Sequence, residues 1–194
     1  MAQRATIRRH PERAVLDPEI IAELLAKGLV AHVGIVEHGQ PYVIPMAYHF
    51  DPSRDRELYL HGGHPGRLLK HLTSGAPVCV EVVLIDGLVF SRTAQYHSVN
   101  YRSVTVFGRG RRVVDLERQR TIMQGMIARY HPDRTAGRDY ETIPDADLKA
   151  TAFVAIEIDE WSAKVRTGGP KGPLDDDPAA PGTAGVAPMP WGYL

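Results

Sequence analysis

The feature that most constrains the fold is a long run of β-type residues from Val99 to Val114. Val104 and Val106 fall on one face of an extended chain, and their neighbours fall on the other. Gly108 and Gly110 lie inside this run, and glycines within a strand favour a bulge or a bend. The segment therefore predicts a long strand in a curved sheet or a barrel.

Several shorter segments also predict strands, and they follow one another with few helices between them. These segments cover residues 29–36, 41–50, 57–61, 77–85, 88–91, 153–159 and 162–166. A loop of four residues, 37–40, is expected to join the first two strands as a hairpin. Asp86-Gly87 is typical of a tight turn, so a second hairpin is predicted there.

Helices are predicted at four places along the chain. Asp17 followed by Pro18 is a strong helix start, and Gly28 is expected to end that helix. The other helices are predicted at about 65–72, at 116–130 and near 144–150. Consecutive hairpins with few crossover helices predict a mainly β, antiparallel fold with peripheral helices, such as a small closed or partly closed barrel.

The composition excludes some classes of function. The chain has 23 Lys and Arg and 23 Asp and Glu, so no excess of positive charge suggests nucleic-acid binding. Cys79 is the single cysteine and lies in an apolar run, where a buried and inert thiol is expected. No segment approaches the ~18 apolar residues of a membrane span. The N-terminus has no secretory pattern, so a cytoplasmic location is expected.

The end of the chain differs in composition from the rest. Residues 167–194 contain six Gly and six Pro, which predicts an irregular tail after a domain covering 1–166, whose first 16 residues form an arm. The acidic run Asp175–Asp177 is expected to be solvated. Trp191, near the end of the tail, either docks on the domain or belongs to a disordered tail.

The segment from Tyr59 to Leu72 has the features of an anion site. A strand is expected to end at His61, and two glycines follow that permit a turn. Pro65 suits the first position of a helix, whose N-terminus attracts anions. Arg67 and Lys70 would add a bidentate donor and a point charge suited to a phosphate. The alternative is a surface helix with two solvated cations.

Pro45 lies inside an otherwise good strand. Proline cannot donate a hydrogen bond to a neighbouring strand, so the strand must be open on one side at this point. Open backbone groups there could bind a flat, hydrogen-bonding heterocycle. A plain edge strand or a bulge is the alternative.

Two other kinds of site find little support. The chain has nine histidines, and His61 and His64 are three residues apart, but no Cys pair or HExxH motif accompanies them. We therefore predict no metal site, although haem ligation by one histidine stays open. The G-x-S-x-G motif of a hydrolase is absent from the sequence.

Four sequence landmarks together carry a resemblance to a known family. They are VIPMAY, LYLHGGHPGRLLKHL, NYRSVTVFG and EIDEWSAKVRTG. The chain resembles the pyridoxamine 5'-phosphate oxidase-like, FMN-binding split-barrel family from about Arg8 to Arg166. Within that family it is most similar to the flavin-nucleotide-binding branch that includes the 5-nitroimidazole reductases.

The resemblance implies a six-stranded antiparallel split β-barrel that forms a homodimer, with FMN at the interface between the subunits. It also implies roles for particular residues. The backbone of Pro45, Met46 and Ala47 would line the flavin ring. The side chains of His61, Arg67 and Lys70 would serve the ribityl phosphate. Tyr101, Arg102 and Ser103 would make polar contacts, and Trp191 of the tail would cap the site. His61 would also be the catalytic residue beside the flavin.

The activity implied is that of an NAD(P)H-dependent oxidoreductase that reduces a small, electron-poor acceptor, as a nitroimidazole reductase does. Two alternatives remain: a non-catalytic flavin-binding or electron-carrying protein, and the same fold with haem or a deazaflavin. The chain departs from the true pyridoxamine phosphate oxidases, because their C-terminal substrate-binding arginine and histidine motif has no convincing match. Fold and cofactor do not determine the substrate.

Overall fold

A computed structural model describes residues 4–53, 56–63 and 66–189. In these ranges nine strands form one antiparallel sheet. The strands are β1 (Ala14–Val15), β2 (Ala31–Glu37), β3 (Gln40–Met46), β4 (His49–Phe50), β5 (Glu57–Gly63), β6 (Pro77–Phe90), β7 (Ser98–Val113), β8 (Thr151–Arg166) and β9 (Gly185–Pro188). Six of them have seven or more residues, whereas β1, β4 and β9 have two, two and four.

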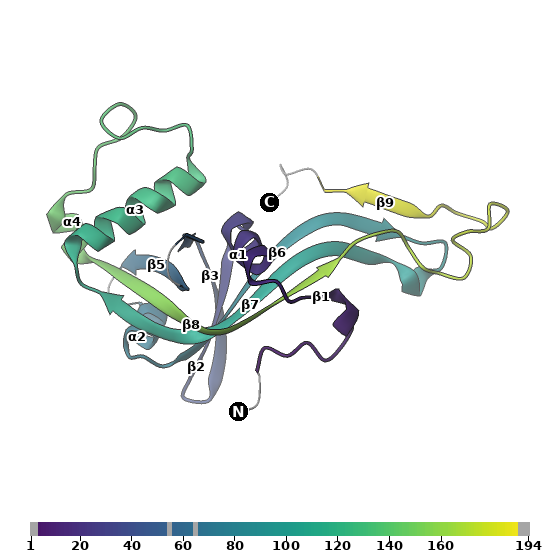
Figure 1. Ribbon diagram of the computed structural model, residues 1–194, viewed down its shortest axis with the longest axis horizontal. Coiled ribbons are helices and arrows are strands. Elements are labelled where there is room, and N and C mark those ends of the chain that lie inside the picture. Colours follow the sequence, from purple (N-terminus) through teal and green to yellow (C-terminus); the bar gives the residue numbers. More distant parts are fainter. Residues whose placement is uncertain (1–3, 54–55, 64–65, 190–194) are drawn as a thin grey trace.

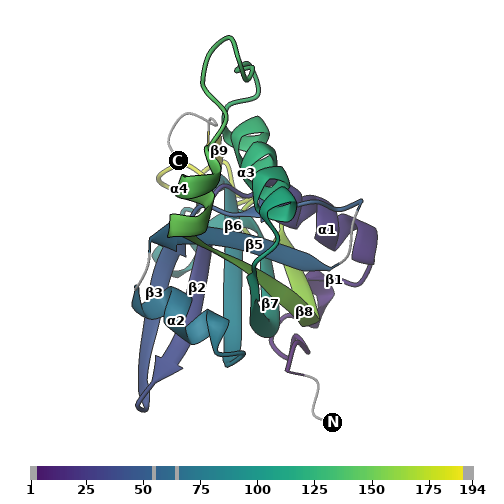
Figure 2. The same cartoon turned by 90° about the vertical axis from the view of Figure 1, so that its left-hand side faces the viewer.

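The sheet curls round an apolar core, and a second apolar cluster includes residues of α3 and α4. Its strand order is β3-β2-β6-β7-β8-β5-β4, with β1 beside β8 and β9 beside β6. The two ends of this order, β3 and β4, are separated in sequence by Ala47 and Tyr48 alone, so the curled sheet brings its ends together (Figures 1 and 2). Val33, Val80 and Val106 are fully buried in a cluster to which the long strands contribute. The predicted fold class, mainly β with peripheral helices, is confirmed.

Four α-helices in the described residues lie outside the sheet. They are α1 (Pro18–Lys27), α2 (Arg67–Thr73), α3 (Leu116–Tyr130) and α4 (Asp145–Ala150), and the short 3-10 turns η1 (Pro11–Arg13) and η2 (Ala94–Tyr96) accompany them. Helix α1 begins as predicted, because the Asp17 carboxylate accepts a hydrogen bond from Glu19 N at 2.9 Å. Asp115 caps α3 in the same way. Among the described residues, no helix is both long and apolar enough to cross a membrane.

The long strands β6 and β7 extend beyond the barrel as an arm, which is distinct from the N-terminal arm predicted for residues 1–16. Figure 1 shows this arm on the right, with β9 along it, while α3 and α4 lie at the opposite end of the molecule. The predicted hairpin turn at Asp86-Gly87 is wrong, since β6 passes through both residues with only a register shift against β7. Arg102 of β7 holds the Asp86 carboxylate at 2.6 and 2.9 Å. Pairing with strands on both sides outweighs the local turn preference.

Two other predictions of strand boundaries need correction. Glu37 and Gln40 pair with each other, so the first hairpin turns through His38 and Gly39 alone, both at positive φ, and not through four residues. The two closing strands predicted at 153–159 and 162–166 are one strand, β8. Its register against β7 shifts after Phe107, where a bulge replaces the expected break.

The tail is more ordered than its composition predicts. Residues 185–188 form β9 and pair with β6, and Met189 N donates to the Asp86 carbonyl at 3.1 Å. Asp175 is not solvated as expected: its carboxylate accepts hydrogen bonds from Ser91 Oγ and Arg92 N, both at 2.8 Å, and from Gly172 N at 2.5 Å. The hydrogen bonds that Asp175 accepts from Ser91 and Arg92 therefore clamp the tail to the arm.

Asp175→Asn should release this clamp. Burial raises the pKa of Asp175, but the hydrogen bonds from Arg92, Ser91 and Gly172 outweigh burial and hold that pKa below its ordinary value of 3.8. The charged form is thus favoured by folding, and its contribution is present above pH 3.8 and is lost as the pH falls through the lower folded value. At pH 7, we expect trypsin to cut after Lys171 about ten-fold faster in the variant.

The neighbouring Asp176 provides the control for this experiment. It is exposed, and no side-chain hydrogen bond holds it to another described residue. Asp176→Asn should leave the cleavage rate unchanged. Equal rates in Asp175→Asn and the unsubstituted protein would contradict the clamp.

Candidate functional site

A pocket of about 510 Å³ opens where the end of α1, the sheet and the end of α3 meet. Its walls are mostly apolar, and they come from four separate stretches of the chain. The lining residues are Lys27, Gly28, Leu29, Val30, His32, Pro45, Met46, Ala47, Val83, Leu84 and Tyr130. This size and this apolar lining with a few polar groups are typical of a small-molecule site.

The predicted open strand is one wall of this pocket. Pro45 lies in β3, which is at the end of the sheet order and has β2 on one side only. Pro45, Met46 and Ala47 all line the pocket, as the resemblance implies for residues around a flavin ring. Because β3 is an edge strand, its backbone on the outer side is available to a ligand.

Close packing of α1 on the barrel shapes the floor of the pocket. Gly28 follows α1 at an ordinary φ of −66°, so backbone freedom is not the reason for a glycine there. A Cβ atom at Gly28 would overlap Val82 and lie 3.0 Å from the Tyr48 hydroxyl. The Tyr48 hydroxyl in turn donates to the Leu25 carbonyl, and Tyr130 Oη donates to the Leu29 carbonyl at 2.7 Å. These bonds hold the chain between α1 and β2.

His32 is one of three polar side chains in this mostly apolar lining, with Lys27 and Tyr130, and the sequence analysis did not single it out. It lies in β2, opposite Pro45 of β3 and Glu81 of β6. Its Nδ1 is buried and has no hydrogen-bond partner among the described residues. The four landmarks that carry the resemblance all come after this strand in the chain, and none lies within it. Alternation in β2 could only place His32 on one face, without showing that a pocket lies there.

The predicted polar residues of β7 lie near the pocket but do not line it. Ser103 pairs with Val83, and Arg102 pairs with Leu84, in the β6–β7 register. Since directly opposite residues share a face, Ser103 and Tyr101 lie on the same side of the sheet as Val83. The Arg102 guanidinium is engaged in the ion pair with Asp86, so in one chain its role is to hold the arm.

The predicted phosphate cations lie further away. Helix α2 begins at Arg67, with Gly66 before it, two residues later than the predicted start. The Arg67 side chain pairs with Glu37 at 3.0 Å and lies over the Tyr42 ring at 4.1 Å. His32 and Glu37 lie near the two ends of β2, and at ~3.3 Å per residue about 16 Å of strand separates them. Lys70 is exposed. Neither cation lines the pocket.

His61 also lies apart from the pocket, under α3. Its Nδ1 is 3.1 Å from the Met126 sulfur, and its ring stacks on Phe153 at 5.7 Å between centroids. Burial lowers the pKa of His61, so the neutral imidazole is favoured at pH 7. The other predicted residues in this region, His64 and Pro65, lie outside the described residues, as does Trp191.

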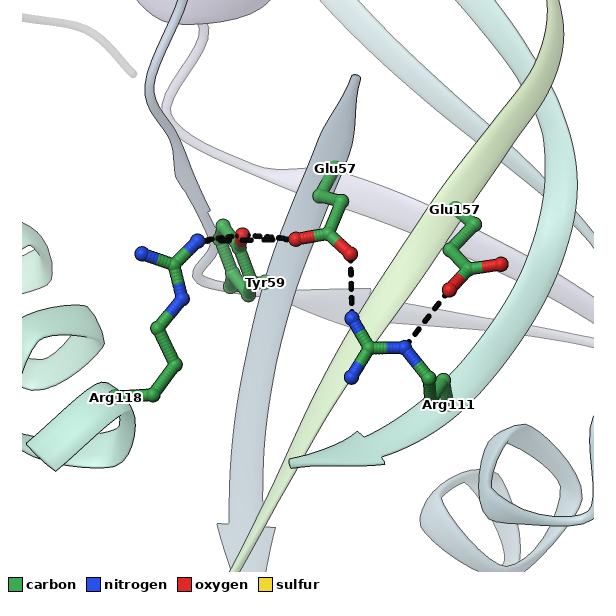
Figure 3. A network of polar contacts seen from close by, with 5 residues as sticks. All are labelled: Glu57, Tyr59, Arg111, Arg118 and Glu157. Atoms are coloured by element: carbon green, nitrogen blue, oxygen red, sulfur yellow. Dashed lines mark hydrogen bonds and ion pairs between the residues drawn. The ribbon is translucent and has the colours of Figure 1, made fainter. Parts of the chain in front are cut away.

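A polar network fixes the beginning of α3 to the barrel (Figure 3). Arg118 donates to the Tyr59 hydroxyl, which donates to Glu57, and Arg111 bridges Glu57 at 2.6 Å and Glu157 at 2.8 Å. Burial raises the pKa of Tyr59 to about 12. Burial would also raise the pKa of Glu57, but hydrogen bonds from Tyr59 and Arg111 lower it overall. The network satisfies its own charges and therefore indicates a structural role.

Metal and thiol chemistry find no support in the described part of the chain. No group of three His, Cys, Asp or Glu side chains there could hold a metal ion. Cys79 is half-buried on β6, and burial raises the pKa of its thiol, with a smaller contribution from Glu81. A raised pKa disfavours the reactive thiolate.

Comparison with known proteins adds to this geometry. Residues 17–165 match the family model described as pyridoxamine 5'-phosphate oxidase. No curated protein matches the chain. The flavocytochrome Anf3 from Azotobacter vinelandii is 31% identical, with a TM-score of 0.83 over 98% of this chain and 86% of that one.

Two further solved structures are similar. An FAD and heme binding protein from Mycobacterium smegmatis is 32% identical, with a TM-score of 0.79 over 91% of this chain and 84% of its own. A candidate 5-nitroimidazole antibiotic resistance protein from Bacteroides thetaiotaomicron is 22% identical, with a TM-score of 0.63 over 78% and 86% of the two chains. At that identity the last similarity supports the fold alone.

Proposed function

Since the chain belongs to the pyridoxamine 5'-phosphate oxidase family, we propose that it is a flavin-binding oxidoreductase whose flavin ring occupies the pocket beside Pro45, Met46 and Ala47. The observation that carries this proposal is the pocket itself: a mostly apolar cavity of about 510 Å³ against an edge strand, with the His32 side chain in its wall. A flat heterocycle with an apolar body and a hydrogen-bonding edge fits those walls.

The similar proteins support a flavin but not one particular form of it. FAD is named for the Mycobacterium smegmatis protein, which is 32% identical. FMN, which the sequence motifs imply, shares its ring with FAD, and we propose FMN as the cofactor here. When bound, the flavin would supply the redox chemistry, by taking up a hydride from NADH or NADPH and returning the electrons to a small, electron-poor acceptor.

The homodimer implied by the resemblance is part of the proposal. His61, Arg67, Lys70 and the three predicted residues of β7 do not line the pocket of one chain. Lys27 is the one cation among the described lining residues, and the predicted phosphate cations lie elsewhere, as a site shared between two subunits would show in a single chain. Light scattering during size-exclusion chromatography tests this, because a monomer that retains flavin tightly would contradict a shared site.

The test of the cofactor is direct. The purified protein, or its apo form titrated with FMN and separately with FAD, should show flavin absorbance near ~370 and ~450 nm and quenched or shifted flavin fluorescence. The absorbance at the longer wavelength should bleach with NADH or NADPH without oxygen and should return when an acceptor is added. A protein that stays colourless in excess of both flavins would contradict the proposal, and bound flavin that no nicotinamide reduces would favour an electron carrier.

A second candidate, a protein that holds haem as well as flavin, is favoured by two of the similar structures. One is a flavocytochrome and the other binds FAD and heme, at 31% and 32% identity. Haem bound by histidine would give a Soret band that flavin does not have. Reconstitution of the apo protein with hemin, with and without FMN, distinguishes one cofactor from two.

A further inference from the structure

His32 has an unusual environment for a histidine in a small barrel. The other residues that line the pocket are apolar or small, apart from Lys27 and Tyr130. The Nδ1 atom of His32 is buried without a hydrogen-bond partner in the described part of the chain. A buried polar atom in this state lowers the stability of the folded protein. A histidine placed at such a cost beside a cavity is a candidate for binding what enters the cavity.

The burial of Nδ1 indicates which ring nitrogen carries the proton. A neutral imidazole has one N–H donor and one bare acceptor nitrogen. A buried N–H group without a partner is the rarer condition in proteins, so the bare nitrogen is expected at Nδ1 and the proton at Nε2. No hydrogen bond to another described residue engages Nε2. The Nε2–H group is therefore the donor that His32 can offer to a ligand.

The charges around the pocket favour a ligand with an electron-rich edge. Lys27 is the one formally charged side chain among the described residues that line it, and no carboxylate lines it, although the Lys27 ammonium lies 3.4 Å from the Glu23 carboxylate on the same helix. Glu81 faces His32 across the β2–β6 pair, but it is exposed and is not part of the lining. The polar side chains of the pocket are thus donors or cations, which attract a group that is, or becomes, negative.

On the basis of the proposed flavin site, we propose that His32 is a cofactor-binding residue that donates through Nε2 to the carbonyl-bearing edge of the flavin ring, and that this hydrogen bond makes the protein bind reduced flavin more tightly than oxidised flavin. Two-electron reduction of a flavin with uptake of one proton leaves one negative charge, which is held on that edge. A donor there stabilises this charge. The residue thereby favours the reduced state of the cofactor.

Three variants test this assignment. His32→Phe keeps a flat ring and removes the donor, whereas His32→Gln replaces the ring by an amide that can still donate. His131→Phe is the matched control, because His131 is exposed at the end of α3 and does not line the pocket. The dissociation constants of oxidised FMN and of FMN reduced by dithionite are measured anaerobically for each protein.

We expect His32→Phe to weaken the binding of reduced FMN roughly ten-fold more than that of oxidised FMN, which is the scale of one hydrogen bond to a charged group. His32→Gln should stay within about three-fold of the unsubstituted protein, and the control should not change. An equal loss for both redox states in His32→Phe would show a merely structural role and would overturn the assignment.

A measurement on the unsubstituted protein does not depend on the folding of any variant. Long-range ¹H–¹⁵N correlation spectra should show the Nε2–H form of His32 without flavin and a shift of the Nε2 resonance when FMN is added. A proton on Nδ1, or an unmoved Nε2 resonance at saturation, would also overturn the assignment. If the unsubstituted protein binds neither FMN nor FAD, the proposed function itself fails. If it binds them, and His32→Phe distinguishes reduced from oxidised FMN as well as the unsubstituted protein does, only the role of His32 fails.

Discussion

Ala47→Trp is expected to abolish flavin binding while leaving the barrel folded. Ala47 follows β3 and is exposed, yet it lines the pocket, so a larger side chain can enter the cavity without overpacking the core. An indole ring in the place of the flavin ring removes both the space and the access to the strand edge. We expect the affinity for FMN to fall at least about 100-fold, or roughly 2.7 kcal/mol, as measured by fluorescence titration of the apo protein.

A tryptophan within β3 itself controls for the introduction of a large apolar side chain. Val43 is 67% exposed and lies outside the pocket. Val43→Trp should therefore bind FMN as the unsubstituted protein does, and both variants should melt at similar temperatures. Retained affinity in Ala47→Trp, with a normal far-ultraviolet circular dichroism spectrum, would show that the flavin binds elsewhere.

Gly110→Ala is expected to be the most destabilising of the substitutions that leave the pocket residues intact. Gly110 lies in β7 against the end of α2, and a Cβ atom there would be 2.8 Å from both the Cα and the carbonyl carbon of Leu72. The obstacle is backbone rather than a flexible side chain, and Leu72 is fully buried, so relief requires α2 to move away from the barrel. We expect a loss of about 3 kcal/mol in the free energy of unfolding.

For a chain of this length, such a loss corresponds to a fall of roughly 6–12 °C in the melting temperature. Urea denaturation with the same slope for both proteins would give the difference in free energy directly. Gly63→Ala is the matched control, because Gly63 is also in a strand but has open space at its Cβ position. It should change stability by no more than about 0.5 kcal/mol. Equal stability of Gly110→Ala and the control would contradict the close approach of α2.

Local sequence signals predicted the helices and most strands well. Asp17 and Pro18 begin α1, and α3 covers the predicted range from Leu116 to Tyr130. In these segments the signals act within one or two turns: a carboxylate that caps backbone N–H groups and an apolar stripe at helical spacing. The alternation of Val78, Val80 and Val82 likewise matches their burial.

The sequence was a weaker guide where two segments compete for one backbone. Asp86-Gly87 has the local preference of a turn, but β7 on one side and β9 on the other extend β6 through it. Asp175 has the composition of a solvated acidic run, but Ser91 and Arg92, more than 80 residues away in sequence, provide donors to its carboxylate. Contacts at such separations leave no mark in a short window of sequence.

The candidate site also combines features that the sequence predicted with features that only the structure shows. Its motifs identified Pro45, Met46 and Ala47, and the proline showed by its missing N–H group that the strand must be open there. The structure places these residues in a pocket but leaves His61, Arg67 and Lys70 outside it, as the described residues of one chain show.

By itself, the sequence determined the antiparallel β class, the positions of the capped helices and the open strand at Pro45, because each depends on residues that are neighbours in the chain. Only the tertiary structure decided that His32, Val83 and the end of α1 meet at that strand, that β6 continues past Asp86-Gly87, and that the tail is clamped to the arm. Those features depend on which strands pair and in what register, and that choice is made by burial and hydrogen bonding over the whole sheet.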